Sequence, residues 1–568
     1  MKYEIFGADG VSLSFTESVL GDITYITVKM TTPAPEIPKE FFVEWLEPVC
    51  ENHSYWGPLL GPVRHIAPDW GARVSDSRTA SGAPVQAVIS NESKNRTTVA
   101  ISDPKIPTKI SMGVDEKKAA MRYKVHFFIK PTTPIDSYEA TIRIDRRDIH
   151  YCDAVRDACE WWETECGYEA ADVPDCALMP MDSLWYSFHQ DLDFDRVLEE
   201  CRLSKQFGLD TVIIDDGWQT TDNGGGYAYC GDWLPIGLPR IKELVDEIHK
   251  LDLKVILWFS VPFLGIYSDS FDKFKDYTLY SFFDDKVYVL DPRYKAVRDY
   301  LKGFYSKAVG EWGFDGLKLD FIDSFCLGND EGKPTHLRDF ESLEDGVEAL
   351  MADVKKELVA LNPDVMVEFR QSYIGPAIRK YGNMLRVGDC PCDALANRRA
   401  IIDLRLTSGK TAVHSDMLMW NVCDTVESVS IQLASILFGV PQISVHLDCI
   451  TEEQKKALSF YMSFWREHRD VLLFGKLYAD APGTLYSKAY SEKDGEAVCV
   501  CYEDPTVSGS WDSLTAVNCT GGTHLYFDGY GGKSYKVVNC MGEALSEGTL
   551  SSLEKIAVPR GGMVFVKN

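Results

Sequence analysis

Long apolar runs are missing from this sequence of 568 residues. No stretch approaches the roughly 18 consecutive apolar residues that a membrane-spanning helix needs. The first residues, Met1–Gly10, likewise contain no apolar signal region. We therefore expect a cytoplasmic protein that has no membrane as a partner.

An excess of basic side chains is also missing. The chain has 59 lysine and arginine residues against 86 aspartate and glutamate residues, which gives a formal net charge of −27. Proteins that bind nucleic acids or anionic lipid surfaces present basic patches. The charge balance therefore argues against nucleic acid as a partner and favours a neutral or cationic small molecule.

Metal-binding spacings are the third absence. The chain has 16 cysteines, but they form no paired C-x-x-C motif, and no H-E-x-x-H motif occurs. A single residue separates Cys390 from Cys392 and Cys499 from Cys501. We expect reduced, buried cysteines. We also expect no structural metal and no cofactor.

The residues that are present predict several domains, because 568 residues exceed the size of a single core. Alternating segments such as Ile23–Met30 and Tyr123–Lys130, separated by turn residues, predict an N-terminal β-sandwich over residues 1–150. Apolar positions three and four apart then predict a linker helix within 151–176. Strand-and-turn patterns return after residue 470 and predict a C-terminal antiparallel β-sandwich over 471–568.

Short apolar runs alternate with longer amphipathic stretches over residues 177–470. This alternation is typical of βα units, and eight of them close a (β/α)8 barrel. The predicted strands are Leu178–Ser187, Thr211–Asp216, Val255–Val261, Gly316–Asp320, Val365–Arg370, Met384–Gly388, Thr411–Met417 and Gln442–Leu447. The predicted helices are Asp195–Phe207, Ile241–Leu251, Val297–Val309, Ser342–Leu358, Ala394–Arg405, Val426–Leu437 and Glu452–Trp465.

Charged and aromatic residues gather where these strands end. Lys318 and Asp320 are two residues apart, so they point to the same side of a strand that is expected to be apolar. The strand ends of such a barrel form its active site. The other residues at these ends are Trp185, Asp215, Asp216, Trp218, Trp258, Glu368, Arg370, Arg386, Asp389, His414 and Asp416.

Carboxylates, a few cations and tryptophans together indicate a sugar site, because charged groups bond hydroxyls and indole rings stack on pyranose faces. Glycoside cleavage needs two carboxyl groups on opposite sides of the anomeric carbon. Asp320 beside Lys318 is expected to stay ionised, whereas Asp389 has fewer formal charges near it in sequence and is predicted to be the proton donor. The alternatives are a structural ion pair for Asp320 and core positions for the tryptophans.

Three motifs carry a resemblance to a known family. In this order and spacing, Ile214–Trp218, Gly316–Asp320 and Arg386–Asp389 resemble the motifs of melibiase-type α-galactosidases, glycoside hydrolase family 36. The resemblance covers the barrel from about Leu178 to Trp465. It implies a retaining exo-α-glycosidase, most simply an α-galactosidase, whose nucleophile is Asp320 and whose acid/base is Asp389.

The resemblance also implies which residues bind the sugar. The paired aspartates would hold hydroxyls such as O4 and O6 of galactose, the lysine would bond ring hydroxyls, and Trp218 or Trp185 would form a wall. The substrate-binding residues on this interpretation are Asp215, Asp216, Trp218, Trp185, Trp258, Lys318, Glu368, Arg370 and Arg386.

Two segments depart from the family pattern. Many relatives have a Cys-Ser-x-Gly-Gly-like turn after strand five, where this chain has Val367–Tyr373, so Arg370 and Gln371 are expected to reshape the pocket near O2. The family's S-D-N-T-D run is replaced by Gly388–Asp393. Asp393 is a second candidate for the acid/base there, although it is better placed to cap the helix that begins near Ala394.

Other functions remain open for the same residues. The sugar could be N-acetylgalactosamine or another α-linked sugar, and a transglycosylase or a non-catalytic carbohydrate-binding protein would use the same pocket. A metal-dependent barrel hydrolase would instead use Asp215, Asp320, Glu368, His414 and Asp416 as ligands. The partner in every sugar-binding case is a small-molecule carbohydrate, and assembly into a homo-oligomer is left open.

Overall fold

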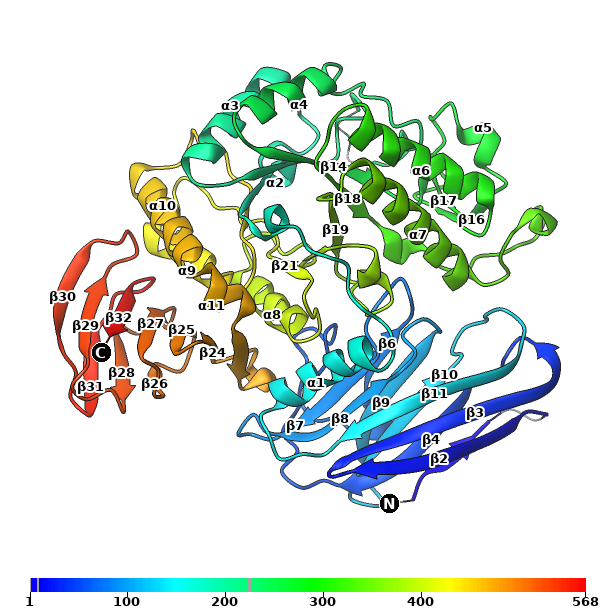
Figure 1. Ribbon diagram of the computed structural model, residues 1–568, viewed down its shortest axis with the longest axis horizontal. Helices are drawn as coiled ribbons and strands as arrows, with labels where there is room; N and C mark the ends of the chain where they lie inside the picture. The colour runs from blue at the N-terminus through cyan, green and yellow to red at the C-terminus, as the bar shows by residue number, and fades with distance from the viewer. Residues whose placement is uncertain (1, 8–9, 223, 225, 568) are drawn as a thin grey trace.

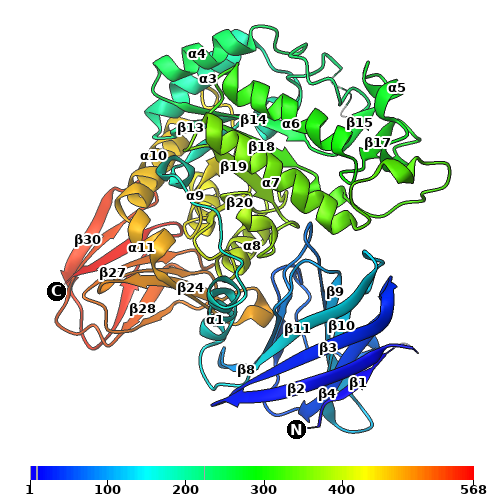
Figure 2. The same ribbon diagram turned by 45° about the vertical axis from the view of Figure 1, so that its right-hand side comes forward.

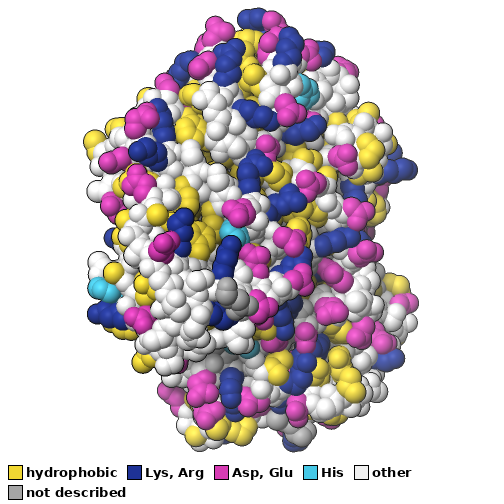
Figure 3. All heavy atoms as spheres, turned by 60° about the vertical axis from the view of Figure 1, so that its left-hand side comes forward, with side chains coloured by type: hydrophobic (Ala, Val, Ile, Leu, Met, Phe, Trp, Pro, Cys, Tyr) yellow, Lys and Arg dark blue, Asp and Glu magenta, His cyan; other side chains and the backbone are white. Residues whose placement is uncertain are grey.

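The computed structural model describes residues 2–7, 10–222, 224 and 226–567. Figure 1 shows an N-terminal β domain, a central barrel with helices outside it, and a C-terminal β domain. This is the predicted fold class. No helix in the described ranges is both long and apolar enough to span a bilayer. The face in Figure 3 carries acidic and basic side chains intermixed.

The N-terminal domain is the predicted β-sandwich, built from two antiparallel sheets. Burial alternates along its strands, for example in β10, so every second side chain enters the core between the sheets. The first sheet has the order β1 (Glu4–Phe6), β4 (Phe41–Pro48), β10 (Ala120–Phe127), β9 (Thr108–Asp115) and β6 (Arg73–Ser77). The second has the order β2 (Ser12–Leu20), β3 (Ile23–Glu36), β11 (Ile135–Asp145), β8 (Asn95–Ile101), β7 (Val85–Ile89) and β5 (Ser54–Trp56).

A single helix, α1 (Tyr151–Thr164), leads from the sandwich to the barrel. The His150 side chain caps it by accepting a hydrogen bond from Cys152 N. The indole of Trp162 is buried and donates to Ile101 O at 2.8 Å, which fixes the helix to β8. Figure 2 shows α1 between the two domains.

The barrel contains eight parallel strands, as the sequence predicts. Its ends meet where Val440 N donates to Val413 O at 2.8 Å and Leu418 N donates to Gln442 O at 2.8 Å, beside the last strand. The strands are β12 (Met181–Ser183), β13 (Thr211–Ile214), β14 (Lys254–Ser260), β18 (Gly316–Asp320), β19 (Met366–Arg370), β20 (Met384–Arg386), β21 (Ala412–His414) and β22 (Gln442–Ile443).

The seven predicted barrel helices are all present, most with ends shifted by one to three residues. Their buried faces pack on the strands, and the caps agree with the sequence: Asp193, Ser342, Asp393, Thr425 and Thr451 each accept a backbone N–H of the following helix. The helices are α3 (Phe194–Gln206), α4 (Ile241–Lys250), α6 (Lys295–Gly310), α7 (Leu343–Leu361), α8 (Ala394–Arg405), α9 (Val426–Ser435) and α10 (Glu452–Glu467).

The first predicted strand, Leu178–Ser187, is wrong at both ends. Residues Asp175–Leu178 form a 3-10 turn, and only Met181–Ser183 is a strand before the short helix α2 (Leu184–Phe188). Leu184 and Phe188 are four residues apart and both buried, which is helical spacing inside an apolar run that resembles a strand. Trp185 and Tyr186 therefore lie on a helix at the mouth of the barrel.

A small insertion between β14 and α6 was not predicted. It contains a three-stranded antiparallel sheet in the order β15, β17, β16. Its elements are β15 (Phe263–Gly265), α5 (Phe271–Phe274), β16 (Thr278–Phe282) and β17 (Val287–Leu290). Short 3-10 turns follow elsewhere in the chain at Ile322–Ser324, Thr335–Leu337 and Ile378–Lys380.

The C-terminal domain, which follows α11 (Arg469–Phe474), also has two packed sheets. Most of its strand pairs are antiparallel as predicted, but β25 pairs with β27 and β26 pairs with β28 in parallel. The larger sheet has the order β23 (Lys476–Asp480), β24 (Lys488–Lys493), β25 (Glu496–Cys501), β27 (Ser513–Asn518), β32 (Met563–Lys567), β29 (Ser534–Val538) and β30 (Ala544–Thr549). The smaller has the order β26 (Thr506–Ser508), β28 (His524–Asp528) and β31 (Leu553–Ala557).

All three domains meet at one buried ion pair, which we call the junction cluster. Arg64 of the N-terminal domain pairs with Asp403 of α8, and Tyr486 of the C-terminal domain donates to the same carboxylate. The indole of Trp56 donates to Asp403 Oδ1 at 2.9 Å. These four side chains have at most 1% exposure and tie the domains together.

Candidate active site

Asp320 ends strand β18 at the mouth of the barrel and is almost fully buried. Its Oδ1 accepts hydrogen bonds from Arg370 Nε and, at 2.8 Å, from Phe321 N. Its Oδ2 accepts one bond, from Trp258 Nε1 at 3.1 Å. One oxygen is therefore held firmly while the other keeps most of its acceptor capacity.

The charge state of Asp320 follows from its neighbours. Burial alone would raise the pKa, but the charges of Arg370, Lys318 and Arg386 outweigh it and lower the pKa of Asp320 to about 2. The carboxylate is thus ionised at neutral pH. Ionisation was predicted from the neighbouring lysine, but Arg370, from the next strand, has the larger effect.

The two aspartates at the end of β13 have separate contacts. Asp215 accepts a bond from Lys318 Nζ at 2.6 Å, across the barrel interior. Asp216 accepts bonds from Gln219 Nε2 at 2.6 Å and Gln190 Nε2 at 2.7 Å. Burial raises the pKa of Asp216 to about 6, although these amides oppose the shift.

Arg386 on β20 bridges two further aspartates. Its Nη2 donates to Asp389 Oδ1 at 2.9 Å, and its Nη1 donates to Asp416 Oδ1 at 2.5 Å. Asp416 also accepts from Cys390 N at 2.6 Å and from Tyr186 OH at 3.0 Å. The arginine thereby fixes the loop after β20 to the end of β21.

The predicted reason for a proton-donor role of Asp389 is wrong. Its side chain is 58% exposed at the rim of the barrel, and it is paired with the guanidinium of Arg386. Partial burial opposes ionisation, but Arg386 and Lys318 lower the pKa of Asp389. Without a substrate, Asp389 is therefore a carboxylate. Asp393 caps α8 by accepting from Ala396 N at 2.9 Å, which is its predicted structural use.

The three tryptophans occupy different places. Trp258 lies under the site and donates to Asp320, and Trp185 is partly exposed on α2, with its ring 4.5 Å from that of His189. Trp218 has no exposed surface; it donates to Trp258 O at 2.9 Å and stacks on Trp233 in the barrel wall. Trp218 therefore belongs to the core and does not form the predicted pocket wall.

Glu368 and His414 lie deeper in the barrel. Glu368 Oε2 accepts from Gln442 Nε2 at 2.6 Å, and burial raises its pKa although Lys318 and Arg386 oppose the shift. His414 bonds Ala177 O through Nε2 at 2.8 Å. The five ligands considered for a metal-dependent hydrolase are thus all bonded to protein groups. Lys318 pairs with Asp215, Arg370 with Asp320 and Arg386 with Asp416. Glu368 and His414 have the contacts just given.

Several residues of the mouth carry no motif and were not predicted. Gln190 and Gln219 hold Asp216, and Tyr373 donates to Leu319 O at 2.9 Å beside Asp320. Only the spatial contacts identify them. The N-terminal sandwich also reaches the mouth, because Arg78 donates to Asp323 O and Phe325 O at 2.8 Å, just after β18.

Comparison with solved structures gives matches over nearly the whole chain. An α-galactosidase from Lactobacillus brevis is 13% identical and superposes with a TM-score of 0.67, covering 99% of this chain and 80% of that one. The chain has the fold of a family 36 α-galactosidase. A variant of the GH36 α-galactosidase AgaA from Geobacillus stearothermophilus, in complex with 1-deoxygalactonojirimycin, is 14% identical with a TM-score of 0.66, covering 98% and 81%.

Similarity in amino-acid sequence extends over a smaller part of the chain than similarity in fold. No family model matches the chain. An A type blood α-D-galactosamine galactosaminidase from Flavonifractor plautii is 24% identical over 166 residues, which are 27% of this chain and 15% of that protein. The chain therefore shares only a small part of that relative's length.

Proposed function

We propose that the protein is a retaining exo-α-galactosidase that removes terminal α-linked galactose from oligosaccharides. The observation that carries the proposal is the ionised carboxylate of Asp320 at the end of β18, whose Oδ2 accepts a single hydrogen bond, together with Asp389 after β20, two strands away in the same barrel mouth. The solved relatives support it, since their names describe α-galactosidases and their complexes contain stachyose or raffinose.

In the first step Asp320 Oδ2 attacks the anomeric carbon, because Oδ1 is already occupied by Arg370 and Phe321 N. The C–O bond to the leaving group breaks, and a β-linked glycosyl-aspartate forms. Water then attacks the same carbon and releases Asp320, so that two inversions give net retention. The low pKa of Asp320 keeps it ionised for the attack.

Asp389 is the proposed acid/base. It must be protonated to deliver a proton to the leaving oxygen, and its hydrogen bond to Arg386 opposes this. A substrate that covers the exposed rim would exclude water from Asp389 and raise its pKa. In the second step Asp389 must accept a proton from the attacking water. It is already a carboxylate, so this step needs no rise in its pKa.

The sugar hydroxyls are proposed to bind the remaining charged groups of the mouth. Asp215 and Asp216 follow β13 and Lys318 lies on β18, with β14 between the two strands, and they offer acceptors and a donor beside Asp320. Trp185 on α2 is partly exposed and offers an aromatic surface for a pyranose face. A cytoplasmic location and a homo-oligomeric assembly stay predictions.

A second candidate is an α-galactosaminidase, which the match to the Flavonifractor plautii protein favours. The contacts of Arg370 argue against it. The guanidinium bonds the carboxylate that attacks C1, so it lies close to any substituent on C2. A 2-ammonium group there would be repelled by the like charge. A neutral hydroxyl fits this position better.

The test is hydrolysis of p-nitrophenyl α-glycosides of galactose, N-acetylgalactosamine, galactosamine and glucose, with chelator present. We expect the galactoside to be preferred, and proton NMR to record α-galactose as the first product. Asp320→Ala should abolish turnover. A β first product would refute retention. A preference for an amino sugar would favour the second candidate, an α-galactosaminidase.

Two further outcomes separate the remaining alternatives. Adding raffinose or sucrose as an acceptor should leave hydrolysis dominant; transfer products in excess of free galactose would indicate a transglycosylase. Saturable galactose binding without turnover of any glycoside would indicate a carbohydrate-binding protein. Loss of activity that is fully reversed by a divalent cation, with His414→Gln equally inactive, would restore the metal-dependent hydrolase.

A further inference from the structure

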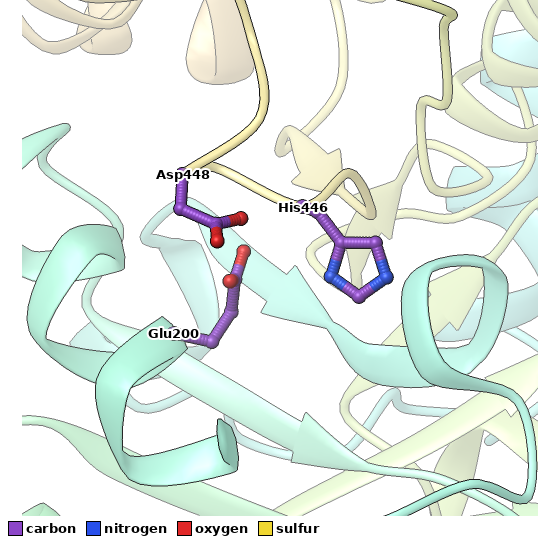
Figure 4. A group of neighbouring side chains, drawn as sticks. All are labelled: Glu200, His446 and Asp448. Atoms are coloured by element: carbon purple, nitrogen blue, oxygen red, sulfur yellow. The ribbon is translucent and has the colours of Figure 1, made fainter.

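A second group of polar side chains lies at the first and last βα units of the barrel and shares no residue with the proposed sugar site. Glu200 comes from the middle of α3, and His446 and Asp448 come from the segment that follows β22 (Figure 4). One nitrogen or oxygen atom of each lies within 4.8 Å of the others. It is the one such group found in the ranges that the structure describes.

The contacts of these side chains leave them short of donors. Glu200 is 4% exposed, and its Oε1 accepts from Leu447 N at 2.9 Å, but its other oxygen has no hydrogen-bond donor among the described residues. Figure 4 shows that its carboxylate points toward that of Asp448. No lysine or arginine in the described part of the chain pairs with either carboxylate within 4.0 Å.

Two carboxylates this close, one of them buried, repel each other unless a cation or a proton lies between them. A further unpaired acceptor lies on the adjacent strand: Asp182 Oδ1 is buried and has no partner, whereas its Oδ2 accepts from Ser204. Arg196 on α3 is the nearby cation, but among the described residues it pairs with Asp191 and not with these carboxylates. The imidazole of His446 offers a nitrogen ligand beside them.

We propose that Glu200, His446 and Asp448 bind a divalent cation of the zinc class. Imidazole together with carboxylates suits zinc better than calcium or magnesium, which take oxygen ligands. Three protein ligands leave a fourth position for water. The bond from Leu447 N orients the Glu200 carboxylate in the way that outer contacts orient metal ligands. The sequence predicts no metal, because these ligands come from segments about 250 residues apart and form no motif.

The ion would join the first and last βα units of the barrel. Strands β12 and β22 are neighbours. Glu200 lies on α3, the barrel helix that follows β12 and α2, and the other two ligands lie in the loop after β22. The same loop supports α2: Ser444 Oγ accepts from Tyr186 N at 2.9 Å and Ser187 N at 3.0 Å, and the His446 ring packs edge-on against Phe188 at 4.7 Å. The cation would therefore fix the helix that carries Trp185.

The first experiment measures metal binding by the full chain after treatment with chelator and reductant. Zinc titration by calorimetry should give one equivalent bound, and zinc should raise the thermal unfolding midpoint, whereas calcium should not. His446→Gln and Asp448→Asn should each weaken zinc binding by at least about tenfold and abolish the thermal shift. Asp448 is exposed, so its variant is expected to fold.

Two controls exclude other sources of zinc binding. His336→Gln changes an exposed histidine elsewhere and should bind zinc as the wild type does. Cys449 is exposed and adjacent to Asp448, so Cys449→Ser should also retain binding, and cobalt in place of zinc should give no thiolate charge-transfer band. Binding that survives in His446→Gln and Asp448→Asn, or the absence of stoichiometric binding by the wild type, would overturn the proposal.

Discussion

The barrel mouth and the junction cluster both contain buried charge, but they differ in how completely that charge is paired. At the junction, Arg64 and Asp403 are fully buried, and Arg64, Trp56 and Tyr486 all donate to the Asp403 carboxylate. At the mouth, six carboxylates share three cations, and the rim is open at Asp389. The mouth consists of Asp215, Asp216, Asp320, Glu368, Asp389 and Asp416 with Lys318, Arg370 and Arg386.

The difference indicates what separates a functional cluster from a structural one. Strongly shifted pKa values occur in both: neighbouring charges raise the pKa of Arg64 despite burial and lower that of Asp320. Shifted values alone therefore do not identify a site. An excess of one charge, together with an opening to solvent, leaves groups available to a ligand.

The largest expected effect is the loss of activity on Asp320→Asn. Removing the nucleophile should lower kcat by roughly four orders of magnitude or more, as for nucleophiles that act with a partner group. Stability should fall by no more than about 2–3 kcal/mol, because the lowered pKa of Asp320 means that Arg370, Lys318 and Arg386 stabilise the negative charge that asparagine lacks. Enzyme kinetics and urea unfolding measure the two quantities. A large loss of stability would mean that the mouth is a structural cluster like the junction.

The matched change, Asp403→Asn, should have the opposite pattern. It leaves the Arg64 guanidinium buried without its counter-charge, and such a loss costs about 3–5 kcal/mol of unfolding free energy. Urea unfolding with Arg64→Met and the double variant Arg64→Met/Asp403→Leu completes the comparison. The double variant should recover most of the loss, and kcat should stay near the wild-type value below the unfolding transition. Equal stability of the single and double variants would contradict the pairing argument.

Asp389→Asn tests the acid/base assignment. Hydrolysis of raffinose, whose leaving group needs a proton, should slow by about 10²-fold or more, while a dinitrophenyl α-galactoside should be affected far less. Azide should restore turnover of the activated substrate and give an α-galactosyl azide. Asp216→Asn is the rival, because burial raises the pKa of Asp216 to about 6. If that variant shows the leaving-group dependence instead, the acid/base is Asp216.

Two tryptophans provide a matched pair of smaller changes. Trp258→Phe removes the hydrogen bond to Asp320 Oδ2 and should lower kcat/KM by roughly tenfold, since hydrogen bonds to charged groups contribute about 1.5–3 kcal/mol. Trp218→Phe should cost about 1–3 kcal/mol of stability through lost packing and its bond to Trp258 O, with little change in KM. An increase in KM for Trp218→Phe would indicate that Trp218 does form part of the pocket wall.

The smallest effect is a change in the pH profile of Arg370→Gln. Arg370 holds the pKa of Asp320 at about 2, so removing its charge raises that pKa toward the ordinary carboxyl value of about 4. Below the new pKa the nucleophile is protonated, and kcat/KM should fall at acidic pH values where the wild type is still active. Arg370→Lys keeps the charge and should keep most of the wild-type profile. An unchanged profile for Arg370→Gln would show that Asp320 does not set the acidic limb.

The barrel and its strand-end residues could be predicted because they depend on local periodicity. The helix Ala394–Arg405 was predicted to the residue, since its cap Asp393 and its apolar spacing are both in the sequence. The helix α2 and the insertion β15–β17 were missed. Their apolar runs are too short to separate helical from strand spacing, and only long-range packing decides between them.

The same limit applies to the site. Lys318 and Asp320 stand out because charge is rare in a buried strand, but the guanidinium that sets the pKa of Asp320 lies 50 residues further along the chain. The environment of Asp389 was misjudged for the same reason: Arg386 is only three residues away, yet its direction depends on the loop between them. Contacts across strands are set by register, which a single sequence does not state.

The contacts of Arg78 with Asp323 O and Phe325 O make the N-terminal sandwich part of the wall around the nucleophile. The barrel is therefore not a module that can be exchanged on its own. A chimaera that grafts this barrel onto another sandwich would expose two backbone carbonyls beside Asp320 and release the loop that follows it. Substitutions on the two sides of this contact should therefore be correlated. Recombination between related genes should give a folded protein when Arg78 and the loop after β18 come from the same parent.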